Sequence, residues 1–136
     1  MKAVLGKFAG GPATLVVEET ADPVACQGEI VVRIRASGVK YPHTLIVQDR
    51  YQFKPSRPFS PGGKLAGIVE ATGLGVRQLK VGDRVLGFST CGAMAEKIAL
   101  KAKNCAAIPA SMPFDEAAAL TPLCTLRHGE RTARLW

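Results

Sequence analysis

The chain has 136 residues, the length of one domain, and 47% of them are hydrophobic, which is enough for a packed core. No window approaches the roughly 18 continuous apolar residues of a membrane span, and the N-terminus lacks the apolar run of a secretory signal, so we expect a soluble, cytoplasmic protein that inserts in no membrane. The net charge of +7 favours anionic partners such as nucleotides, nucleic acid or acidic proteins.

Short strands separated by Gly and Pro turns dominate the chain. β-branched or alternating apolar residues predict strands over residues 1–8, 14–20, 29–38, 64–73, 84–88 and 95–100. The third of these alternates well and is expected to be half-exposed. Gly67 interrupts the fourth, which indicates a bulge or a close approach of another backbone.

Two short helices complete the predicted elements. Pro42 suits the first turn of a helix over residues 43–51, and Pro113 precedes a helix over 114–120 with acidic residues in its first turn. Residues 52–63 contain three prolines and two glycines and predict an extended loop. This pattern favours a mainly β fold with short helices, in the form of a small, partly open β-barrel.

The domain organisation follows from the same pass along the chain. The ordered elements predict a single domain over residues 1–120. The remaining residues, 121–136, are polar, basic and weakly periodic, and we expect them to form a basic C-terminal tail or part of a truncated helix.

Four cysteines stand alone in the sequence, and none forms a C-x-x-C pair. They are Cys26, Cys91, Cys105 and Cys124. Zinc requires several ligands converging at characteristic spacings. We therefore interpret the four as reduced thiols and expect no metal site.

Basic side chains outnumber acidic ones between residues 40 and 64. The basic residues are Lys40, Arg50, Lys54, Arg57 and Lys64, against the single acid Asp49. The aromatic residues of the same segment are Tyr41, Tyr51, Phe53 and Phe59. A basic groove with stacking aromatics can bind single-stranded nucleic acid, and a solvated basic face with no ligand explains the charge equally well. We rank nucleic-acid binding last.

Several motifs occur in a fixed order along residues 1–120. They are "GGP", "GEIVVRIRASGV", "PHTLIVQDRY", "PFSPGGKLAGIVEATG", "LKVGDRV" and "MPFDEAAAL". This order resembles the N-terminal, GroES-like domain of the medium-chain dehydrogenase/reductase superfamily. The zinc-independent NADPH:quinone oxidoreductase branch of that superfamily looks most similar.

The resemblance implies a fold, a reaction and a cofactor. The fold is a GroES-like, partly open β-barrel, and the reaction is hydride transfer from NADPH to a quinone or an activated enone. Members of the family also carry a Rossmann half, but no G-x-G-x-x-G turn follows a strand in this sequence. We therefore expect a substrate-side domain with no complete nucleotide site, and little or no turnover by the chain alone.

The resemblance also points to the loop that lines the active-site cleft. The resemblance implies that the wall of this cleft, which faces substrate and cofactor, contains Lys40, Tyr41, His43 and Tyr51. Lys40 replaces the asparagine of the family pattern, His43 replaces an aspartate, and Lys64 stands at an acidic position. At all three positions this sequence is more basic than the family pattern.

Each of these residues also has a purely structural interpretation. Lys40 either contacts a nucleotide phosphate or is a solvated loop cation. His43 is either a general acid or a cap of the following helix, and the absence of a nearby carboxylate favours the cap. Tyr51 either flanks the cleft or anchors its loop.

A non-catalytic function is the main alternative. Without a nucleotide-binding half, the apolar surface that packs against it would be exposed and would promote association. The protein would then be a protein-binding or oligomerising module, with a homodimer as the simplest assembly.

Overall fold

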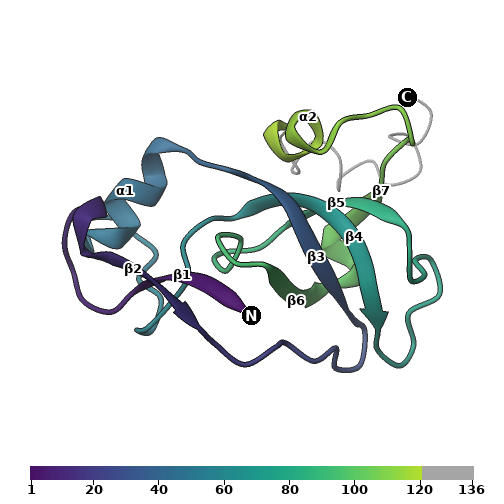
Figure 1. The fold of residues 1–136 in the computed structure, drawn as a ribbon, viewed down its shortest axis with the longest axis horizontal. Helices are drawn as coiled ribbons and strands as arrows, with labels where there is room; N and C mark the ends of the chain where they lie inside the picture. Colours follow the sequence, from purple (N-terminus) through teal and green to yellow (C-terminus); the bar gives the residue numbers. More distant parts are fainter. Residues whose placement is uncertain (121–136) are drawn as a thin grey trace.

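The computed structural model describes residues 1–120, and they form two antiparallel sheets with short helices at their edges (Figure 1). The strands are β1 (Lys2–Gly6), β2 (Leu15–Glu19), β3 (Glu29–Gly38), β4 (Lys64–Thr72), β5 (Arg84–Phe88), β6 (Lys97–Lys101) and β7 (Cys105–Ala107). The helices are α1 (Tyr41–Val47), α2 (Phe114–Ala119) and two 3-10 turns, η1 (Pro12–Thr14) and η2 (Ala102–Asn104). The expectations for residues 121–136 lie outside the described part of the chain.

The larger sheet carries the hydrophobic core. Its five strands run in the order β6-β3-β4-β5-β7, and β1 pairs with β2 in a separate two-stranded sheet. Ile30, Val32, Leu65, Val69 and Val85 are fully buried and belong to one cluster. Burial of an aliphatic side chain of this size contributes about 1.5–3 kcal/mol, so this cluster at the centre of the sheet contributes much of the hydrophobic stabilisation of the domain.

Gly67 lies where β3 and β4 approach each other closely. The pairing of the two strands shifts register between Ile34 and Ala36, opposite Gly67 and Ala66. A Cβ atom on Gly67 would lie 2.1 Å from the carbonyl oxygen of Arg33. The close approach predicted from the sequence is therefore confirmed.

Helix α1 covers a different range from the one predicted. It begins at Tyr41, ends at Val47, and buries Ile46 and Val47. Asp49 has a φ of 57°, outside the helical region, and its carboxylate accepts a hydrogen bond from Arg57 Nη2 at 2.8 Å. The same nitrogen donates to the Val47 carbonyl at 3.0 Å. The prediction that the helix continues to residue 51 was wrong because Arg57 stabilises an earlier end.

Helix α2 packs beside the other end of the large sheet, away from α1 (Figure 1). It begins at the predicted residue, Phe114, and has Asp115 and Glu116 in its first turn. The Arg84 guanidinium lies 4.1 Å from the centre of the Phe114 ring. This stacked contact connects α2 to β5.

The mainly β fold with short helices is confirmed, in the form of open sheets rather than a closed barrel. All six predicted strands are present, whereas β7 and the two 3-10 turns were not predicted. None of the helices within residues 1–120 is both long and apolar enough to cross a bilayer.

Candidate functional site

Strand pairing brings three separate segments around one cavity. Lys64, the first residue of β4, lies opposite Gly38 of β3 and opposite Phe88 of β5. The loop that leads into α1 therefore emerges beside β4, and the loop after β5 emerges on its other side. The cavity between them has a volume of about 250 Å³.

The backbone at Gly63 closes one wall of this cavity. The Ser89 N–H donates to the Gly63 carbonyl at 2.8 Å, and a Cβ atom on Gly63 would lie 2.6 Å from the Ser89 carbonyl oxygen. Only a glycine permits this approach without a backbone shift. The Ser89 hydroxyl donates to the Cys91 carbonyl at 2.7 Å, which fixes the loop further.

Three of the four predicted site residues line the cavity. Lys40, His43 and Tyr51 belong to its lining, together with the apolar side chains of Phe53 and Phe88. Tyr41 is 74% exposed and lies outside the cavity lining. The roles of these four residues toward a substrate or cofactor stay predictions.

His43 has a defined tautomer. Its Nδ1 accepts a hydrogen bond from the Lys40 backbone N–H at 3.0 Å, so the proton of the neutral ring is on Nε2. Burial, followed by the charges of Lys40 and Lys64, lowers the pKa of His43 below its ordinary value. The cap predicted for this residue is present, and Nε2–H remains available as a neutral donor.

Lys64 is the most unusual group in the cavity. Its Nζ is buried and has no hydrogen-bond acceptor among residues 1–120. Burial, followed by the neighbouring Lys40, lowers the pKa of Lys64 from 10.5 to about 8. Two ammonium groups thus share a site that contains no acidic side chain.

Lys64, Phe88 and Thr90 were absent from the predicted site. Lys64 stands at a position that is acidic in the family pattern, and the Gly62-Gly63 pair before it is a further local signal of close packing. Phe88 and Thr90 carry no local signal, because only the pairing of β4 with β5 brings them to the cavity.

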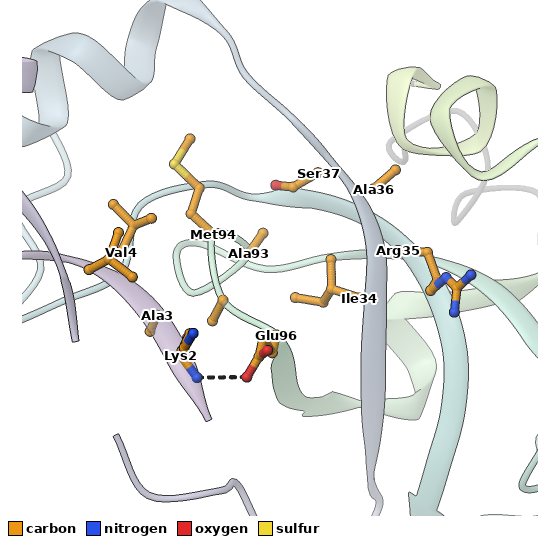
Figure 2. A pocket seen from close by; sticks show the side chains of 12 residues that line it. Lys2, Ala3, Val4, Ile34, Arg35, Ala36, Ser37, Ala93, Met94 and Glu96 are labelled. Atoms are coloured by element: carbon orange, nitrogen blue, oxygen red, sulfur yellow. Dashed lines mark hydrogen bonds between the residues drawn. The ribbon is translucent and has the colours of Figure 1, made fainter. Parts of the chain in front are cut away.

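A second, more open cavity of about 350 Å³ lies between β1 and β3 (Figure 2). Its walls are mostly apolar, and the Lys2 backbone N–H donates to Glu96 Oε2 at 2.7 Å across one side. Arg35 points to the other side of β3 from Ile34 (Figure 2). Because the Glu96 carboxylate already accepts this backbone hydrogen bond, the cavity is a weaker candidate for a catalytic or binding site.

Neither a metal centre nor a whole dinucleotide site fits the residues described. No group of three or more His, Cys, Asp or Glu side chains within residues 1–120 could hold a metal ion. All pairings of strands in this part of the chain are antiparallel. A pyrophosphate cradle is built on a parallel β-α-β unit, so these residues do not supply one.

Two open antiparallel sheets, short helices and a cavity at the sheet edge define a mainly β domain of GroES-like type. The sequence profile of the alcohol dehydrogenase GroES-like domain matches residues 26–110, and the chain belongs to this family. The family is part of the medium-chain dehydrogenase/reductase superfamily, as the resemblance of the ordered motifs implied.

Similar proteins include quinone oxidoreductases. The chain is 34% identical to quinone oxidoreductase from Rattus norvegicus over 122 residues, which cover 88% of the chain and 37% of the rat protein. It is also 34% identical to the synaptic vesicle membrane protein VAT-1 homolog-like from Mus musculus over 119 residues, covering 88% of the chain and 28% of the mouse protein. The chain thus spans well under half the length of these curated relatives.

Solved structures show the same similarity. Escherichia coli quinone oxidoreductase in complex with NADPH has a TM-score of 0.84 and 33% identity, covering 89% of this chain and 37% of that chain. The human VAT-1 homolog-like protein has a TM-score of 0.86 and 34% identity, covering 88% and 39%.

Proposed function

We propose that residues 1–120 are the substrate-side domain of a zinc-independent, NADPH-dependent oxidoreductase that reduces a quinone or an activated enone. The observation that carries this proposal is the cavity, which combines the aromatic walls of Phe53 and Phe88 with the His43 side chain. The similarity to quinone oxidoreductases, one of them solved with NADPH, supports the reaction and the cofactor.

The chemistry assigned to the domain is orientation of the acceptor. Reduction of a quinone or enone places negative charge on its carbonyl oxygen, which a fixed N–H donor stabilises. The His43 Nε2–H can donate to that oxygen while Nδ1 remains in the helix cap. Tyr51 flanks the acceptor ring, and Lys40 and Lys64 make the surrounding potential positive.

The test separates binding from turnover. Duroquinone titrated into ¹⁵N-labelled protein should shift amides of the cavity segments, around residues 40–43 and 88–90, and His43→Ala should weaken its binding. An assay of NADPH oxidation with the same quinone should show little or no turnover by the 136-residue chain, because no pyrophosphate cradle is present in residues 1–120. Shifts that avoid the cavity would refute the proposal, and robust turnover would contradict the expected inactivity.

A non-catalytic, protein-binding function is the second candidate. Val39 and Tyr41, the sequence neighbours of the cavity-lining residue Lys40, are 72% and 74% exposed. Apolar side chains at this position favour contact with another domain, a partner protein or a second copy of the chain. Sedimentation at micromolar concentration distinguishes this case, since a clean monomer argues against a homodimer.

A further inference from the structure

The cavity beside α1 contains basic side chains without an acidic counterpart. Lys40, His43 and Lys64 line it, and its lining includes no Asp or Glu. Neither lysine forms an ion pair with any residue of the described range, whereas Lys97 forms two. The positive charge of this cavity is therefore not neutralised by residues 1–120.

The arrangement of the two lysines is unfavourable without a counterion. The Nζ of Lys64 is withdrawn from solvent and has no acceptor among the described residues. A buried ammonium group loses its hydration and gains nothing in return unless it is paired. The nearby Lys40 charge adds repulsion, as the lowered pKa of Lys64 indicates. An anion held between the two groups would replace one repulsion by two attractions.

The other side chains that line the cavity indicate what kind of group the anionic ligand carries. Tyr51, Phe53 and Phe88 are half-exposed and line the cavity. Its volume of about 250 Å³ lies just below the roughly 300 Å³ at which drug-sized sites begin. A single planar ring with one anionic substituent matches these walls better than a bare inorganic ion.

We propose that this cavity binds a small aromatic carboxylate, with the carboxylate between the ammonium groups of Lys40 and Lys64 and the ring against Phe53 and Phe88. The site stands whether or not the domain takes part in hydride transfer. The further step, that the substrate reduced by the enzyme carries an acid group, rests on the proposed function.

The probe is benzoate, with benzamide as its neutral isostere and inorganic phosphate as the anion without a ring. Each is titrated into the ¹⁵N-labelled 136-residue chain at pH 6.5 and low salt, and amide shifts are followed. Benzoate should bind at least about tenfold more tightly than benzamide, a difference of about 1.4 kcal/mol. It should also bind more tightly than phosphate, with shifts at residues 40–43, 63–64 and 88–90.

Matched variants test which lysines bind the carboxylate of benzoate. Lys64→Met and Lys40→Met should each reduce benzoate affinity about tenfold, while leaving benzamide affinity within twofold. Lys54→Met removes the same charge from an exposed residue outside the cavity lining and should have little effect. Amide spectra show which variants are folded. If Lys64→Met does not fold, Lys40→Met provides the test, because Lys40 is exposed.

The outcomes are distinct. Equal affinity for benzoate and benzamide, or unchanged benzoate binding in the folded lysine variants, would overturn the proposal. Phosphate binding as tightly as benzoate would overturn its aromatic part. Because no cofactor or turnover is involved, these results are separate from a failure of the proposed reductase function.

Discussion

His43 Nδ1 accepts a hydrogen bond from the backbone N–H of Lys40 at 3.0 Å, and this contact joins the start of α1 to the candidate site. The reciprocal backbone bond, from the His43 N–H to the Lys40 carbonyl, is also 3.0 Å long. The His43 side chain therefore both caps the start of the helix and lines the cavity. A cationic ring would carry a proton on Nδ1 and could not accept this bond.

Replacement of His43 tests its structural contribution. We expect His43→Ala to lower the free energy of unfolding by about 1 kcal/mol, the typical net contribution of one hydrogen bond. His43→Gln retains an acceptor at the third helical position, as in a capping box, and should recover much of this loss. Urea denaturation of the three proteins measures both effects. Equal stability of the Ala variant and the parent would show that the bond contributes nothing.

The titration of Lys64 tests the proximity of the two lysines. We expect Lys64 to titrate near pH 8, because burial and then the Lys40 charge lower its pKa. Lys40→Met removes the second cause and should raise the Lys64 pKa, whereas Lys54→Met should not. ¹³C NMR of reductively methylated lysines, assigned with Lys64→Met, measures the shift. A Lys64 pKa near 10.5 in the parent would contradict the described cavity.

Gly67 should tolerate no side chain. A Cβ atom there would lie 2.1 Å from the Arg33 carbonyl oxygen, which belongs to the neighbouring strand and cannot move freely. We expect Gly67→Ala to destabilise the domain by about 3 kcal/mol through overpacking. Gly11→Ala is the control, because no atom lies within 4 Å of its Cβ position. Thermal or chemical unfolding compares them, and similar stabilities would refute the β3-β4 geometry.

Acid should weaken an ion-pair network at the N-terminus. Asp22 accepts from Lys97 Nζ at 2.7 Å and from the amino terminus at 2.9 Å. These contacts, the Lys97 bond first, lower the pKa of Asp22 from 3.8 to about 2. The unfolded chain therefore binds the proton first, so the stabilisation is complete above about pH 4 and is lost as the pH falls toward 2.

Asp22→Asn should reduce stability at pH 6 and flatten its decline between pH 4 and 2. Glu116→Gln, at an exposed acid of α2, serves as the control for a general loss of charge. Melting temperatures across this pH range provide the measurement. A parallel decline in Asp22→Asn and the parent would show that Asp22 does not contribute to the acid dependence.

The cysteines should differ sharply in reactivity. Cys26 is exposed, whereas burial raises the pKa of Cys105 to about 12. Because the thiolate is the reacting form, we expect iodoacetamide at pH 8 to label Cys26 at least about a hundredfold faster. Peptide mapping by mass spectrometry separates the sites, and denaturant should equalise their rates. Rapid labelling of native Cys105 would contradict its packing against β5.

Local patterns in the sequence determined most of the fold. Alternating apolar residues predicted β3 over its full length, and Gly67 marked the close approach because a glycine inside a strand offers no side chain to pack. These features depend only on neighbours along the chain. The end of α1 was predicted wrongly because it depends on Arg57, eight residues beyond Asp49.

The composition of the site was decided by tertiary structure. The sequence identified Lys40, His43 and Tyr51 through the family motif, but it did not join them to Lys64 or Phe88. Lys64 reaches the cavity because β4 pairs in register with both β3 and β5. Strand register is a long-range property that places distant side chains together. The charges of Lys40 and Lys64 are therefore neighbours only in the folded sheet.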